Sequence, residues 1–453
     1  MFCLTASRIH IIHVGNMNNK GTQALLKSDV NLIKEILGNV YISVSTNDVE
    51  GVRKLNLPLD DVLPTIIDIP YEVADRQAKR FRYSRDESKY RVYALASFLY
   101  MFIQAVFSVI SVVSVKAGSR ALYRTELVNH IKECDLVVSC SDENFKESAS
   151  LLPLNIYWVL AWWSVLFERT WEILVAKSLG KPVVMLPNSV GPFRTWIGRF
   201  LSRLSLNNCD CLLVREPTSY GIVKSLRIRS PKILTFDTAL LFKTEGGLSS
   251  TDFSSPVIAV SPGIYSHALS ENEVHDYVKA HAKALDKAIE EHELLVVFLP
   301  HFISGFQYDD LDMSRLILRE MRNSSKAKIL VTDTVEELKS KIDQMDMVIS
   351  SKMHPAVLAI SGYVPTLCIA YDHKQTAFFM ELGLGKCVIR LRELSYGILV
   401  SKIDYVWNNR DEIGTQLAER IPKLQKHTRE SIKQALTGAV LRKDNSTFRG
   451  DRN

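Results

Sequence analysis

A lysine and a histidine follow a short apolar run in the last third of the chain. The run covers residues 346–349 and ends in two serines, after which come Lys352 and His354. Pro355 then stands where the first turn of a helix tolerates proline. A cation and an imidazole at the carboxyl end of a buried strand, beside a helix N-terminus, suit a substrate that carries phosphate or carboxylate.

Three more candidates stand at or near predicted strand ends. His301 follows the apolar run 294–299, Arg215 ends the run 211–215, and Lys374 lies in a loop after a later strand. We interpret His354 as an acid–base group, because imidazole titrates near neutral pH, and His301 as either a second acid–base group or a contact to the acceptor. Each candidate has a local alternative: capping or packing for His354, a surface ion pair for Arg215, and a solvated side chain for Lys374.

The segment 15–21 is a glycine-containing loop that leads into a predicted helix at Thr22. Its N–H groups could receive a phosphate or the hydroxyls of a sugar. The loop lacks both the Lys-Ser/Thr pair of a P-loop and the GxGxxG spacing of dinucleotide-binding proteins, so it is weak evidence for a nucleotide.

The stretch 348–384 resembles the C-terminal signature of the polysaccharide pyruvyl transferases. That signature runs basic-x-His, small helix, Gly-x-Pro, strand, Tyr-x-x-Lys and Leu-Gly-Leu, and this chain supplies Lys352-Met353-His354, Gly362-Tyr363-Val364-Pro365, Tyr371-Asp372-His373-Lys374 and Leu382-Gly383-Leu384. The segments 15–25, 187–193, 214–216 (with Ser219) and 237–239 resemble other parts of the family pattern in the same order. The resemblance therefore extends over most of the chain.

The resemblance implies a GT-B-like α/β fold of two Rossmann-like domains facing a cleft. It also implies transfer of the carboxyvinyl unit of phosphoenolpyruvate to a sugar of a cell-surface glycan or its lipid-linked precursor, which ends as a pyruvate ketal and releases phosphate. No separate cofactor is needed. The implied catalytic residues are His354 and His301, the donor contacts are Lys352, Arg215 and Lys374, and the acceptor contacts are Gly15, Asn16, Gly21, Asp142 and Asn188.

Two positions depart from the family pattern. Lys352 stands where many members have arginine, so a point charge replaces a planar fork that could hold an anion through two hydrogen bonds. The sequence Ser139-Cys140-Ser141-Asp142 stands where the family often has a glycine-rich turn.

Length and composition agree with two α/β domains. The 453 residues are 47% apolar, which allows two buried cores, and strands alternate with helices, which indicates mostly parallel sheets. We expect an N-terminal domain over 1–246 with an apolar helical insertion at about 79–130. A linker at 243–255 leads to a C-terminal domain over 255–425, and a helical or disordered tail follows over 426–453.

Charge and cysteine usage exclude several classes of function. The formal charge of +6 is small for this length, which argues against nucleic-acid binding. The seven cysteines form no CxxC pair, which argues against a zinc site and a disulfide framework and favours a reducing compartment. No metal is expected. The N-terminus reads as a buried strand rather than a secretion signal.

Two charge-free apolar runs, 92–115 and 151–167, bear on membrane contact. The first is long enough to cross a bilayer, has Lys and Arg on both sides, and the second holds three tryptophans. Three arrangements are open: helices that dip into one leaflet, a buried helical insertion, or true spans. Spans would separate strands of one sheet, so we favour contact with one leaflet, with headgroups met by Arg80, Arg82, Arg85, Lys89 and Arg91. The expected location is the cytoplasm, peripheral at the inner face of the membrane.

Two other functions stay open from the sequence. One is a GT-B glycosyltransferase that uses a nucleotide sugar, because the fold would look similar. The other is a non-catalytic, membrane-associated glycan-binding protein that keeps the fold without the activity.

Overall fold

The computed structural model describes residues 8–68, 87–118, 125–147, 156–244, 253–263, 269–303 and 309–450. Three of the basic residues expected to meet headgroups, Arg80, Arg82 and Arg85, lie outside these ranges, as do the side chains of Lys89 and Arg91. The middle of the expected linker, 245–252, also lies outside them.

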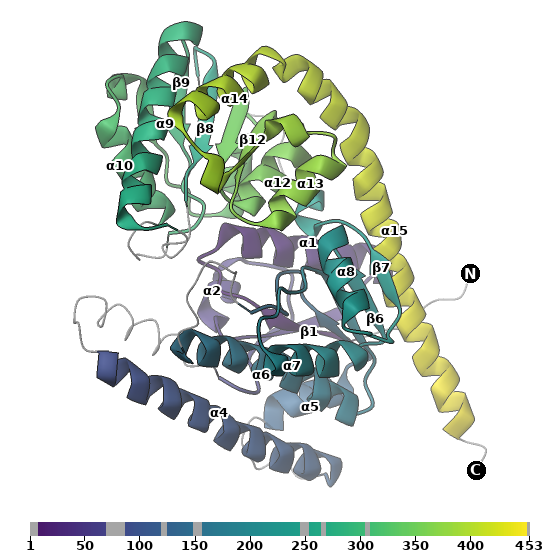
Figure 1. Ribbon diagram of the computed structural model, residues 1–453. Helices are drawn as coiled ribbons and strands as arrows, with labels where there is room; N and C mark the ends of the chain where they lie inside the picture. Colours follow the sequence, from purple (N-terminus) through teal and green to yellow (C-terminus); the bar gives the residue numbers. More distant parts are fainter. Residues whose placement is uncertain are drawn as a thin grey trace. The chain divides into compact units, whose positions relative to one another are not determined.

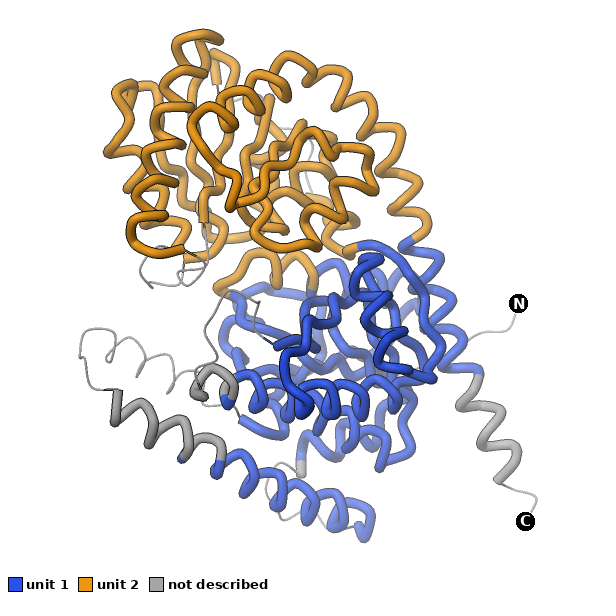
Figure 2. Tube along the Cα trace, in the orientation of Figure 1, with its two compact units in different colours: residues 1–17, 26–236, 428–453 blue, residues 18–25, 237–427 orange. Residues whose placement is uncertain are grey.

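The chain divides into two compact units (Figure 2). Unit 1 holds residues 1–17, 26–236 and 428–453, and unit 2 holds residues 18–25 and 237–427. The division therefore falls beside Phe236, ahead of the segment expected to be the linker. Two helices, α1 (Lys20–Leu37) and α15 (Arg410–Gly450), contribute residues to both units.

Unit 1 is built on a seven-stranded parallel sheet in the order β3-β2-β1-β4-β5-β6-β7. Its strands are β1 (Arg8–Val14), β2 (Tyr41–Thr46), β3 (Asp61–Pro64), β4 (Leu136–Ser139), β5 (Val183–Asn188), β6 (Cys211–Val214) and β7 (Lys232–Leu234). Sequence order reverses between β1 and β4, which is the switch point of a doubly wound sheet. The two edge strands, β3 and β7, were not predicted because they are short and only partly buried.

Unit 2 is built on a six-stranded parallel sheet in the order β10-β9-β8-β11-β12-β13. Its strands are β8 (Val257–Ser261), β9 (Leu295–Phe298), β10 (Ala327–Ile329), β11 (Met347–Ser350), β12 (Thr366–Ala370) and β13 (Val388–Arg390). The switch point lies between β8 and β11. The central strands are buried throughout, as expected for a parallel sheet covered on both faces.

Helices follow most strands in both units (Figure 1). Unit 1 adds α2 (Val49–Lys54), α4 (Glu87–Lys116), α5 (Thr125–Glu133), α6 (Ile156–Ser178), α7 (Trp196–Asn207) and α8 (Pro217–Ser225). Unit 2 adds η1 (Thr238–Leu241), α9 (Glu271–His292), α10 (Asp310–Glu320), η2 (Ser324–Lys326), α11 (Val335–Ile342), α12 (Met353–Ser361), α13 (His373–Glu381), η3 (Gly385–Cys387), η4 (Leu391–Glu393) and α14 (Tyr396–Asn408). The expected fold class, two Rossmann-like α/β units with an apolar helix inserted in the N-terminal half, is confirmed.

The inserted helix is α4, which packs on α5 and α6 within unit 1 (Figure 1). The second apolar run, 151–167, belongs largely to α6, which also packs on α7. Every described side chain of this run, from Leu160 onward, is buried or half-buried. The Trp163 indole donates to Glu147 Oε1 (3.0 Å) and Thr195 Oγ1 (3.1 Å), so this tryptophan faces the interior of unit 1 rather than a headgroup region.

A buried polar network joins the unit 1 sheet to α6. His10 bonds through Nε2 to Ser45 Oγ (3.2 Å), and Ser45 donates to Glu172 Oε1 (3.2 Å). His13 Nε2 donates to the carbonyl of Arg169 (2.9 Å) and lies 3.7 Å from Glu172 Oε2. Burial lowers the pKa of both histidines, so they are neutral. Burial, and then the nearby Glu168 carboxylate, raise the pKa of Glu172.

The raised pKa of Glu172 predicts a pH-dependent contribution to stability. Between the ordinary glutamate pKa of about 4.3 and the raised value, the folded state keeps a proton that the unfolded state releases, so this contribution falls as pH rises. Glutamine cannot ionise. We therefore expect Glu172→Gln to gain unfolding free energy relative to the parent protein between pH 5 and pH 8, measured by urea unfolding. Glu50→Gln, at an exposed position, is the matched control, and parallel pH profiles for Glu172→Gln and the parent would contradict the assignment.

Candidate functional site

Lys352 and His354 lie in the turn between β11 and α12, as the sequence predicts. Lys352 is the N-cap residue of α12 with extended backbone angles. The Ser350 hydroxyl accepts from its N–H (3.1 Å) and donates to its carbonyl (2.8 Å), which shapes the turn. Both side chains therefore project from the carboxyl edge of the unit 2 sheet, where ligands bind in open α/β sheets.

The structure brings His301 next to His354. His301 follows β9, and β8 alone separates β9 from β11 in the sheet, so residues after these strands meet at one edge. The two imidazole rings have centroids 6.1 Å apart and planes inclined by 20°. Gly21, at the start of α1, lies against the His354 ring. A Cβ at this position would stand 2.2 Å from His354 Nδ1.

Two buried aspartates face these side chains. Asp310, at the start of α10, accepts through Oδ2 from the N–H groups of His301 (3.0 Å) and Phe302 (2.9 Å). Its Oδ1 lies 3.7 Å from Lys352 Nζ. Asp237 places Oδ2 3.9 Å from His354 Nε2. One carboxylate therefore orients the loop after β9 and faces a cation, and the other lies beside the imidazole of His354.

The electrostatic environment makes His301 neutral. Burial is the main cause that lowers its pKa well below 6.5, and the charges of His354, Lys352 and Lys20 lower it further. Neither ring nitrogen of His301 has a hydrogen-bond partner among the described residues. Burial also lowers the pKa of Lys20, while Asp310 opposes that shift. The site thus brings two lysines, two imidazoles and two aspartates together in a largely buried environment, where the lysines can contact an anionic ligand.

Lys374 stands at the start of α13 in unit 2. Its Nζ lies 3.9 Å from Asp372 Oδ2, and the next residue, Gln375, donates from Nε2 to the carbonyl of Ser351 (3.3 Å). Tyr277 holds the other side of this turn, with its hydroxyl 2.6 Å from Ser351 Oγ. Lys374 is buried and indirectly connected to the Lys352 turn, rather than a solvated surface lysine.

Arg215 belongs to a separate cluster in unit 1. Its side chain is only 2% exposed, and its Nε donates to Ser189 Oγ (2.8 Å) while Nη2 lies 3.4 Å from Glu143 Oε1. Ser189 in turn donates to Glu216 Oε2 (3.0 Å). Arg215 does pair with its neighbours, but inside the unit and not at its surface.

The other unit 1 candidates lie at the carboxyl ends of β1, β4 and β5. Asn188 donates to the carbonyls of Cys140 and Leu186 (both 2.9 Å) and accepts from the Asn144 N–H (3.1 Å), so its amide holds the loop after β4. Asp142 is half-buried in that loop. Gly15 and Asn16 directly follow β1.

The turn at 139–142, where the family often has glycines, is held by a side chain from α1. Asp29 accepts from the Ser141 N–H (2.7 Å) and from its hydroxyl (2.8 Å). Hydrogen bonds to the Asp29 carboxylate thus hold the conformation of this turn in the absence of glycines.

A family model described as "Polysaccharide pyruvyl transferase" matches residues 24–373. The chain belongs to the polysaccharide pyruvyl transferase family. One relative, the amylovoran biosynthesis protein AmsJ of Erwinia amylovora, is 21% identical over 313 residues, which cover 66% of this chain and 72% of that protein.

Solved structures show that this member of the family has a GT-B-like fold. A UDP-GlcNAc 2-epimerase from Neisseria meningitidis, bound to UDP-GlcNAc, superimposes with a TM-score of 0.57 at 9% identity, covering 95% of this chain and 99% of that one. A UDP-N-acetylglucosamine 2-epimerase from Listeria monocytogenes gives 0.56 at 10% identity, covering 96% and 97%. At such identities the likeness concerns the fold alone.

The sequence did not predict a role for three residues of the unit 2 site: Lys20, Asp237 and Asp310. Asp237 lies in the segment 237–239, which resembles the family pattern, but the sequence predicted no function for this residue. Asp309 and Asp310 open a helix, and an N-cap signal there predicts the helix but not which carboxylate turns inward. In the sequence, Lys20 looks like a solvated residue of a polar loop. The structure shows that this side chain is buried within unit 2.

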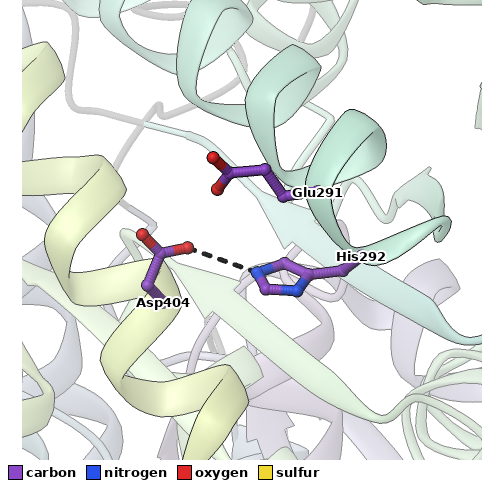
Figure 3. Close-up of side chains that lie close together, drawn as sticks. All are labelled: Glu291, His292 and Asp404. Atoms are coloured by element: carbon purple, nitrogen blue, oxygen red, sulfur yellow. Dashed lines mark hydrogen bonds and ion pairs between the residues drawn. The ribbon is translucent and has the colours of Figure 1, made fainter.

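A further group of metal-ligand residue types lies at the opposite edge of the unit 2 sheet: Glu291, His292 and Asp404 (Figure 3). His292 ends α9 just before β9, and its Nε2 lies 3.3 Å from Asp404 Oδ1. Glu291 is exposed and pairs with Lys287 at 3.3 Å. These contacts join α9 to α14, and the group lies away from the strand ends that carry His301 and His354.

The close approach of Gly21 to His354 predicts a steric requirement for glycine. Gly21→Ala must displace the His354 ring, and overpacking of this kind typically costs about 1–3 kcal/mol. Gly397→Ala is the matched control, because Gly397 is also the second residue of a helix, and nothing lies within 4 Å of an added Cβ. We expect Gly397→Ala to be neutral or stabilising. Equal unfolding free energies for the two variants would contradict the described packing.

Proposed function

We propose that this pyruvyl transferase moves the pyruvyl group of phosphoenolpyruvate onto two hydroxyls of a glycan or its lipid-linked precursor. The observation that carries the proposal is the set of His354, His301, Lys352 and Lys20 at one strand edge in unit 2. Phosphoenolpyruvate is small and carries both a phosphate and a carboxylate, so two buried lysines match its charges.

The reaction requires one proton to reach the donor carbon skeleton. The C3 methylene of phosphoenolpyruvate takes a proton and becomes a methyl group, while a sugar hydroxyl forms a bond to C2. A second hydroxyl then forms a bond to C2 as the C2–O bond to phosphate breaks, giving the ketal and inorganic phosphate. The two hydroxyl protons balance the proton taken up by C3 and the one left with phosphate or base.

The two histidines have different parts in this proposal. His354 delivers the proton to C3, because imidazole is suited to proton transfer and its Nε2 lies 3.9 Å from the Asp237 carboxylate. His301 is neutral, since burial and three cations lower its pKa. It therefore acts as a hydrogen-bonding group toward the ligand rather than as a proton store. Lys374 and Arg215 stay predicted donor contacts.

The acceptor is proposed to be a glycan of the cell envelope or its lipid-linked precursor. Support comes from the relative whose name places it in amylovoran biosynthesis. Four of the five predicted acceptor contacts, Gly15, Asn16, Asp142 and Asn188, lie in unit 1, and the fifth, Gly21, lies in unit 2. Because the amide of Asn188 is used by main-chain groups, its proposed contribution is to shape the loop that carries Asp142.

Donor binding can be tested by thermal unfolding of the purified protein with phosphoenolpyruvate, UDP-sugars or inorganic phosphate. A ligand that binds only the folded state stabilises it by ~2.7 kcal/mol at one hundred times its Kd. We expect stabilisation by phosphoenolpyruvate, and about 10- to 100-fold weaker binding for Lys352→Ala, since a charge-assisted contact contributes about 1.5–3 kcal/mol. Lys326→Ala, at an exposed lysine, is the control. Stabilisation by a UDP-sugar alone would favour the glycosyltransferase instead.

The proton-donor role of His354 predicts a separation of binding from turnover. His354→Gln keeps a hydrogen-bonding side chain but cannot carry the proton, so donor binding should persist while phosphate release falls about 10²- to 10⁴-fold. Phosphate release would be measured with a panel of glycan acceptors. Donor binding without phosphate release by the parent protein on every acceptor would favour a non-catalytic glycan-binding protein, and full turnover by His354→Gln would exclude His354 as the acid.

A further inference from the structure

Helix α4 presents a continuous apolar face to solvent. Large apolar side chains that are between 43% and 61% exposed cover this face: Leu99, Tyr100, Phe102, Ile103, Val106, Phe107, Val109, Ile110 and Val113. Exposed apolar residues normally occur singly on soluble proteins, and a contiguous set marks a binding surface. We call these nine residues the α4 face.

The opposite side of α4 is attached to unit 1 by polar contacts. Gln104 donates from Nε2 to the Asp68 carbonyl (3.0 Å) and accepts from the Asp68 N–H (2.9 Å). The Trp171 indole donates to Ser108 Oγ (2.6 Å), and Lys132 Nζ donates to the Val115 carbonyl (2.8 Å). The side of α4 that faces unit 1 thus combines these polar contacts with the buried apolar residues Met101, Val112 and Val115. The α4 face adds exposed apolar residues on the other side, the reverse of the pattern on a water-facing helix.

Length and composition alone would let this helix cross a membrane. Residues Leu99–Lys116 have a mean hydropathy of 1.8, and 18 helical residues span about 27 Å. A crossing helix would have to leave the Gln104, Ser108 and Lys132 contacts and carry its polar residues into hydrocarbon. Because these contacts hold the helix along unit 1, its geometry suits a helix lying along a surface.

Two features favour lipid over a second copy of the chain as the occupant. The nine residues include no charge and no amide, so the face lacks the polar groups that set register between paired helices. Basic residues stand on both sides in the sequence, among them Lys89 and Arg91 before the face and Lys116 after it. Apolar side chains bounded by cations match a bilayer with anionic headgroups.

We propose that the α4 face docks on an anionic lipid surface, with α4 lying in the plane of one leaflet. The nine side chains enter the boundary between headgroups and acyl chains, and Lys116 at the end of α4 contacts the headgroups. The docking deepens the proposed function by bringing the enzyme to lipid-linked glycans at the cytoplasmic face of the membrane. The lipid contact can be tested without donor or acceptor, so its failure and that of the proposed reaction are distinguishable.

The test is flotation of the full chain with preformed vesicles of phosphatidylcholine, with or without phosphatidylglycerol. We expect binding that is stronger to the anionic vesicles and reversible on dilution. The double variant Val106→Asp with Ile110→Asp places two carboxylates in the centre of the α4 face, and its partition coefficient should fall at least ~10-fold. Val331→Asp with Met380→Asp adds the same charge at exposed apolar positions of unit 2 and should leave binding unchanged.

Three outcomes overturn the proposal. Equal losses in the two double variants would mean that charge, and not the α4 face, decides binding. The proposal also fails if no vesicle binds, and a dimer that Val106→Asp with Ile110→Asp dissociates would then identify a second copy as the occupant. Binding released only by detergent would mean that α4 crosses the bilayer. Vesicle binding without any response to phosphoenolpyruvate would leave the docking intact and count against the proposed reaction.

Discussion

The unit 2 site depends on the buried carboxylate of Asp310. One of its oxygens is occupied by the N–H groups of His301 and Phe302, and the other faces Lys352. An uncompensated buried charge would be costly, so this carboxylate holds the loop and the cation together. The loop in turn places His301 beside His354, and burial, with a further contribution from the nearby cations, lowers the pKa of His301 and keeps it neutral. Two imidazoles of the same sequence type therefore acquire different chemical properties.

Polar groups are distributed unusually around α4 and α6. A network of histidine, serine and glutamate lies between the unit 1 sheet and α6, and further hydrogen bonds attach α4 to α6 and its surroundings. Nine exposed apolar residues then cover the outer side of α4. An apolar surface of this kind is stable in water only at a cost, and contact with lipid removes that cost.

The GT-B-like fold supplies the framework but not the chemistry. UDP-GlcNAc 2-epimerases share the arrangement of two parallel sheets at about 10% identity, and the carboxyl edges of such sheets accept many ligands. What separates this chain is the side chains at those edges, in particular the Lys352–His354 turn. The family match over residues 24–373 includes this turn.

The sequence by itself determined the local elements that carry the chemistry. Apolar runs, serines and Pro355 identify the β11–α12 turn with Lys352 and His354, and the spacing of the family motifs identifies the fold, because these signals involve residues close in the chain. Tertiary structure alone decided that Lys20, Asp237 and Asp310 join His354, since they come from distant segments. It also decided which apolar run is exposed: both lack charge, but α6 is covered by its neighbours, whereas α4 keeps one face open.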